Sequence, residues 1–145
     1  MTLVSKSPLG PLQVAIVAVL KADTALATLL GGSKIYDQRV PEQTAYPYLL
    51  LGDHLSIPDN DLTSFGRDVT STIHIWTRTR TNKAGQDIAA AVNELLDHQV
   101  EALNDVIIGH KVISIRNTFD QALTDPDPEL RHHVLRFRVQ TAQTS

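Results

Sequence analysis

The most regular pattern in the chain lies between Leu12 and Leu30, where apolar side chains recur at helical spacing. Gly31 and Gly32 follow directly, and glycine readily adopts the left-handed backbone conformation with which many helices end. The pattern therefore predicts a helix over residues 12–30, with a bend near the polar Asp23.

A second helical stripe lies beside a run of three alanines, which are strong helix formers. Its apolar members share one helix face and are Ile88, Val92, Leu95 and Leu96. We therefore expect a second helix from about Lys83 to Leu96, with this face turned toward the core.

Strand-like segments separate and follow these two helices. Residues 69–78 are the clearest case, because β-branched and aromatic side chains dominate there and suit a pleated surface. Residues 48–55, 112–119 and 131–141 are also predicted to be strands, and Ile35–Tyr36 a short extended piece. Along the last strand Leu135, Phe137 and Val139 alternate with Val134, Arg136, Arg138 and Gln140.

The order helix, strand, strand, helix, strand, strand predicts an α+β fold. We expect an antiparallel sheet of about four strands, with both helices on one face, in a single domain over residues 1–145. The ends at residues 1–10 and 142–145 are expected to be flexible. A polar, turn-rich loop is expected from Ser56 to Arg67.

Composition limits the classes of function that the chain can serve. Its 145 residues are enough for one domain with a proper core, and 42% of them are hydrophobic. It has no cysteine, which excludes disulfides, thiolate zinc sites and cysteine catalysis. Its net charge of -3 argues against a protein whose main task is to grip nucleic acid.

No pattern in the sequence predicts an enzyme. The six histidines are scattered and form no helical zinc motif. Asp53, Asp59 and Asp61 lie in a turn-rich segment that lacks the glycine and terminal glutamate of a calcium loop. We therefore predict no catalytic residue, no metal site and no cofactor, and no apolar run reaches the ~18 residues of a membrane span.

Four stretches, in order, resemble a known family of small phage proteins. They are the opening helix that ends in Gly31-Gly32 before Ile35-Tyr36-Asp37, Val40-Pro41 with Ala45-Tyr46-Pro47-Tyr48, residues 72–78 (TIHIWTR), and residues 132–138 (HHVLRFR). Together they cover nearly the whole chain. The chain resembles the tail-completion, or tail-terminator, proteins of siphovirus-like phages, prophages and gene transfer agents.

The resemblance implies a structural virion protein of the tail–head junction, assembled in the host cytoplasm. Such proteins form rings, typically hexamers. One ring face caps the major tail tube protein, the other meets the head completion or connector protein, and genomic DNA passes through the lumen without sequence-specific binding. Two alternatives remain open, namely a head-side connector or minor tail protein and a small nucleic-acid-binding α+β module.

Six residues are candidates for contacts with other subunits or partners. Ile57, Leu62 and Phe65 lie in the predicted loop, where they either order against another subunit or the tail tube or pack locally. Trp76 is either a buried structural anchor or an interface anchor, since tryptophan is enriched in binding hot spots. Arg136 and Arg138 either form a solvated strand face or meet acidic groups of a neighbour or the DNA channel.

A ring adds a demand on the subunit. Each copy must present two different, complementary surfaces, because a head-to-tail interface closes only when its rotation divides a full turn. An unpaired edge strand, or the extended segment Ser33–Tyr48, is a candidate for pairing with a neighbour by strand addition. The chain is also compatible with a monomer that closes into a ring only on the tail tube.

Overall fold

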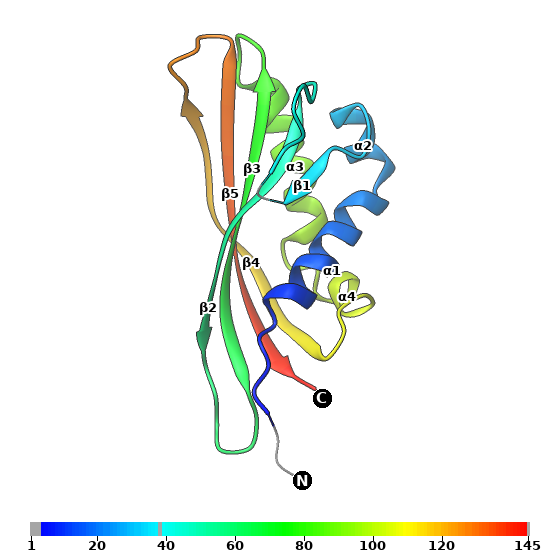
Figure 1. Cartoon of the computed structure of the whole chain (residues 1–145), viewed down its shortest axis with the longest axis vertical. Coiled ribbons are helices and arrows are strands. Elements are labelled where there is room, and N and C mark those ends of the chain that lie inside the picture. Colours follow the sequence, from blue (N-terminus) through cyan, green and yellow to red (C-terminus); the bar gives the residue numbers. More distant parts are fainter. Residues whose placement is uncertain (1–3, 38, 145) are drawn as a thin grey trace.

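One β-sheet carries all the helices on one of its faces, as Figure 1 shows. The computed structural model describes residues 4–37 and 39–144. The helices are α1 (Leu9–Ala22), α2 (Thr24–Leu30), α3 (Lys83–Leu96) and α4 (Val100–Asn104). The strands are β1 (Ile35–Asp37), β2 (Tyr48–Pro58), β3 (Gly66–Arg78), β4 (His110–Thr124) and β5 (Leu130–Gln143). The predicted α+β class, with helices on one face, is confirmed.

The sheet has five strands in the order β1-β2-β3-β5-β4, and not the predicted four. The four long strands are antiparallel, as predicted, whereas β1 pairs in parallel with β2. Ile35 lies opposite Leu49 in this pair and is buried. The three-residue β1 is therefore an edge strand that the sequence showed only as a short extended piece.

The core lies between the inner face of the sheet and helices α1, α2 and α3. Leu51 on β2, Ile73 on β3 and Phe137 on β5 point toward the helices and are fully buried. From the helical layer, Ile16 and Val92 join the same cluster. The predicted helix over residues 83–96 is confirmed, because its apolar stripe is the face packed on the sheet.

The first helix breaks at Asp23, where a single bent helix was predicted. The Asp23 carboxylate accepts a hydrogen bond from the backbone N–H of Leu26 at 2.8 Å and thereby caps α2. The axes of α1 and α2 differ by 83°. This bend keeps both Leu20 and Leu26 in the core. Within the described residues, no single helix is long and apolar enough to cross a membrane.

Helix α4 was not predicted, and two helices become four. It has only five residues, which is too short for a periodic pattern to reveal. Its last residue, Asn104, exchanges two hydrogen bonds with Val112, at 2.8 and 3.0 Å, and ties the helix to β4. The chain therefore enters β4 through a short helix followed by turn and bend residues.

The strands run further than the sequence predicted. The predicted loop Ser56–Arg67 shrinks to residues 59–65, because β2 continues to Pro58 and β3 begins at Gly66. Strands β4 and β5 likewise extend to Thr124 and Gln143. Polar side chains obscured these extensions, since the outer face of the sheet carries no helix and tolerates them.

The first and last described segments, residues 4–8 and 142–144, lie at the same end of the molecule as the β2–β3 turn (Figure 1). The side-chain oxygen of Gln143 accepts from the backbone N–H of Lys6 at 2.8 Å, and its amide donates to the carbonyl of Val4 at 2.7 Å. The backbone N–H of Gln143 also donates to the carbonyl of Phe65 at 2.8 Å. Val4, Lys6 and Gln143, which belong to the ends predicted to be flexible (1–10 and 142–145), are thus hydrogen-bonded beside the β2–β3 turn.

Candidate interaction surfaces

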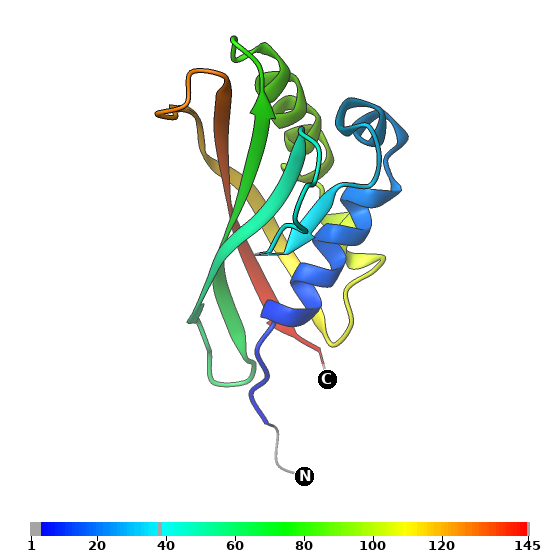
Figure 2. The same ribbon diagram turned by 45° about the horizontal axis from the view of Figure 1, so that its top comes forward.

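The β2–β3 hairpin projects beyond the helical layer (Figures 1 and 2) and ends in a tightly bonded tip. The Asp61 carboxylate accepts from the backbone N–H groups of Thr63 and Ser64 at 2.8 and 2.7 Å. These bonds hold the pKa of Asp61 below its usual value, so the tip carries a negative charge at neutral pH. Between Asp61 and Thr63, the side chain of Leu62 is fully exposed.

Exposed apolar side chains continue from the tip along the outer face of this hairpin. Leu55 and Ile57 alternate on β2 and lie opposite Thr70 and Asp68 of β3. We call Leu55, Ile57 and Leu62 the apolar hairpin. Ile57 and Leu62, two of the predicted contact residues, both belong to this surface, and Leu55 is a third member that was not predicted. Phe65 is the last residue of the turn before β3. Its side chain is half-buried, so it packs partly against its own chain and lies near the apolar hairpin.

Trp76 lies on the outer face of the sheet and is half-buried there, so it is not a core anchor. Its ring stacks on that of His132, with centroids 3.9 Å apart and planes at 7°. On the other side, Nε2 of His132 lies 2.7 Å from Nδ1 of His74. Cross-strand pairing of β3 and β5 builds this row, because Trp76 lies directly opposite His132.

The histidines of this row favour the neutral state. Burial, followed by the charge of the nearby His74, lowers the pKa of His132 to about 4. Burial is also the main cause that lowers the pKa of His74, against the opposing charge of Asp53. One ring therefore donates and the other accepts across the 2.7 Å contact at neutral pH. The row is a packed, uncharged ridge on the outer face.

Arg136 and Arg138 point outward from β5, opposite the buried Phe137 and its neighbours, as the alternation predicted. Arg138 holds the carboxylate of Asp68 through three contacts of 2.7 to 3.1 Å, and this pair lowers the pKa of Asp68. Arg136 lies over the ring of Phe119, with its guanidinium carbon 4.7 Å from the ring centroid. Each arginine thus has a partner within its own sheet.

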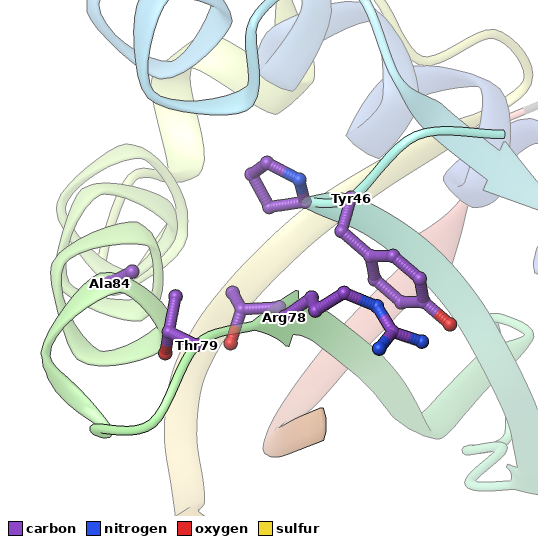
Figure 3. A pocket seen from close by; sticks show the side chains of 6 residues that line it. Tyr46, Arg78, Thr79 and Ala84 are labelled. Carbon is purple, nitrogen blue, oxygen red and sulfur yellow. The ribbon is translucent and has the colours of Figure 1, made fainter. Parts of the chain in front are cut away.

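A small open pocket, drawn from close by in Figure 3, lies at the end of β3 that is farthest along the strand from the hairpin tip. It has a volume of about 280 Å³ and is lined by Tyr46, Pro47, Thr77, Arg78, Thr79 and Ala84. Arg78 lies over the ring of Tyr46 at 5.3 Å and pairs with Glu129 at 3.6 Å. Arg78 is thus the one charged residue in a lining of hydroxyl and apolar side chains, and these lining residues contain no acid–base pair for catalysis.

Metal-binding geometry is also missing from the part of the chain that the structure describes, where no three His, Asp or Glu side chains converge. His132 and His133 point to opposite faces of β5, as their adjacency in a strand predicts. His133 contacts Asp120 on the inner side, while His132 stacks on Trp76.

Sequence reasoning missed a second apolar surface, between α1 and the edge strand β1. This groove has a volume of about 440 Å³. It is lined chiefly by Val14, Val17, Ala18, Lys21, Ile35 and Asp37, and we call it the α1–β1 groove. The signal was present in the sequence, because residues 14–19 (VAIVAV) are apolar on every side of the helix. A helix that buries only one face usually has polar residues on the opposite face, so apolar residues all round indicate a second apolar surface.

Comparison with known proteins gives consistent matches. A family described as "Tail completion protein gp17" matches residues 14–142. The tail completion protein gp17 of Bacillus phage SPP1 is 30% identical over 93 residues, which cover 64% of this chain. The same alignment covers 66% of the SPP1 protein, just under two thirds of its length.

Two solved structures resemble the fold. A chain of the virion of a native gene transfer agent particle superposes with a TM-score of 0.84 at 25% identity, covering 95% of this chain and 99% of that one. The structure of the SPP1 gp17 protein superposes with a TM-score of 0.56 at 23% identity, covering 94% and 92% of the two chains. This second match concerns the fold alone.

Proposed function

Because the chain belongs to the tail completion protein gp17 family, we propose that it forms a closed ring, typically of six copies, that terminates the tail and joins it to the head. As a member of this family, it is a structural component of a phage-type tail and not an enzyme. The family match over residues 14–142 is the observation that carries the proposal. Its proposed partners are further copies of itself, the tail tube protein and the head connector.

The shape of the subunit supports a head-to-tail ring. The two edges of the sheet differ, since β1 has three residues and β4 has fifteen. Strand β4 also carries irregularities after Val112 and after Asn117, which interrupt a regular ladder. A head-to-tail ring needs two different surfaces on each copy, and the two sides of this subunit do differ.

DNA is proposed to pass through the lumen without being gripped. Arg138 is neutralised by Asp68, Arg136 is occupied by Phe119, and the chain has a net charge of -3. Strong phosphate pairing would make release costly and salt-dependent. We expect no retention of duplex DNA in a gel-shift at physiological salt. Tight, salt-sensitive binding would favour the nucleic-acid-binding module instead.

The position of the protein in the particle is tested by assembling particles without it. We expect tails of uncontrolled length that do not join to heads, because no ring stops growth of the tube. Supplying the unaltered chain should restore joined particles. Normal tails already attached to heads in its absence would contradict the proposal. Complete tails of normal length that lack only fibres or tip proteins would favour a minor tail protein.

A further inference from the structure

We propose that the apolar hairpin of one copy docks into the α1–β1 groove of the next copy around the ring. This inference rests on the proposed function, because it specifies the surfaces through which the ring closes. The β2–β3 hairpin and the α1–β1 pair lie on different parts of the same chain (Figure 2), so a contact between them that passes from one copy to the next around a ring is head-to-tail.

The hairpin has the features of an element built to insert. Leu62 is fully exposed, although the tip around it is held by hydrogen bonds to Asp61 and by a bond from Gly66 N–H to Asn60 at 3.1 Å. A bonded tip loses little conformational freedom on binding, which favours affinity. Ile57, 53% exposed, extends the apolar surface along the adjoining strand.

The α1–β1 groove offers a matching recess. Its floor and walls are mainly apolar, and Val14 on its rim is 65% exposed. It adjoins β1, and among the described residues no strand pairs with the outer edge of β1. An apolar recess next to an open strand edge can take both a leucine side chain and the backbone of an incoming hairpin.

Charge favours a second copy of this chain as the occupant. Residues 54–66 contain Asp59 and Asp61 and no lysine or arginine. On the groove side, Lys21 lines the recess and is exposed, while Asp37 is the single acidic lining residue. A basic residue at the rim can thus meet the acidic tip while Leu62 enters the apolar part.

Cysteine cross-linking tests the contact directly, because the chain has no cysteine of its own. A variant with Leu62→Cys and Val14→Cys is oxidised as an assembled ring, formed in solution or on tail tubes. We expect a ladder of covalent oligomers up to the full ring. A variant with Leu62→Cys and Ile113→Cys is the control, since Ile113 lies on the distant β4 edge. On a denaturing gel this control should run as single chains, without covalent oligomers.

A matched pair of substitutions gives an independent readout. Ile57 and Ile113 are both strand isoleucines with 53% exposure. We expect Ile57→Ser to raise the concentration for half-assembly about tenfold, as the loss of a buried aliphatic contact implies, whereas Ile113→Ser leaves it unchanged. Rings that form without the Leu62–Val14 ladder, or that cross-link equally through Ile113, would overturn the inference while the ring itself stands.

Two further results would also count against this contact. If Ile57→Ser rings assemble normally but no longer attach to tail tubes, the hairpin serves the tube and the inference is wrong. If no ring forms with or without tail tubes, the proposed function itself fails before cross-linking is reached.

Discussion

At the scale of single residues, four histidines share a lowered pKa with burial as its main cause, namely His54, His74, His110 and His132. For His132 the pKa falls to about 4. These rings serve as neutral packing groups, and His132 in particular fills the space between Trp76 and His74.

Stability should therefore fall as the pH drops below about 6.5, the usual histidine pKa. Unfolded chains take up protons on these rings in that range, while the folded rings stay neutral, so acid favours the unfolded state. Urea titrations at pH 7 and pH 5, followed by the fluorescence of the single tryptophan, measure the effect. His132→Phe should reduce the difference between the two pH values. An unchanged difference would contradict the role assigned to burial.

A second comparison separates folding from assembly at the residue scale. Phe137→Ala should lower the free energy of unfolding by about 3–5 kcal/mol, because its ring is fully buried against the helices. Leu62→Ala should change it by less than about 0.5 kcal/mol, because its side chain has no burial to lose. Chemical denaturation of the monomer measures both. A large loss for Leu62→Ala would mean that the hairpin tip supports the fold.

At the scale of elements, the break between α1 and α2 sets the shape of the helical layer. Asp23 leaves the helical conformation and caps α2, and Gly31 ends α2 in the left-handed conformation. The 83° bend turns the chain so that β1 can pair with β2 along one edge of the sheet. The α1–β1 groove lies next to that bend and depends on it.

Asp23→Ala should lower the free energy of unfolding by about 1 kcal/mol, the usual cost of losing a helix cap. Thr24→Ala is the matched control, because Thr24 is exposed and contributes only its backbone oxygen to the described hydrogen bonds. Thermal or urea unfolding of both variants provides the measurement. Equal effects of the two substitutions would contradict the capping role of Asp23.

The sequence predicted long, periodic elements well and short or polar ones poorly. The stripe of α3 and the alternation of β5 each require one buried face, so their patterns survive in the sequence. Strand β1 and helix α4 are too short to show a period, and their places come from tertiary contacts. Polar side chains on the uncovered outer face hid the extensions of β2 and β4.

The candidate contact residues divided in the same way. Ile57 and Leu62 could be recognised because apolar side chains stood in a polar, turn-rich segment. The half-buried position of Trp76 and the pairing of Arg138 with Asp68 depend on the cross-strand register of β3 and β5. Sequence alone does not fix that register. The groove went unnoticed because Val14 lies in a helix whose other apolar residues account for the core.

At the scale of the whole molecule, several large apolar side chains remain exposed and do not contribute to the core. Part of this surface lies on the hairpin and beside α1, and includes Leu62 and Val14. Exposed apolar surface of this kind is typical of binding sites for a partner, and it supports the proposed contact between copies. The outer arginines Arg136 and Arg138 are engaged by Phe119 and Asp68 within the sheet, which supports the proposal that DNA passes without being gripped.

The mass of the purified protein, measured by light scattering across a concentration range and followed by imaging of the largest species, tests the central claim most directly. The account predicts a closed ring near six copies with a central hole, either free in solution or when tail tubes are added. A strict monomer at every concentration, with no ring on the ends of added tail tubes, would contradict it.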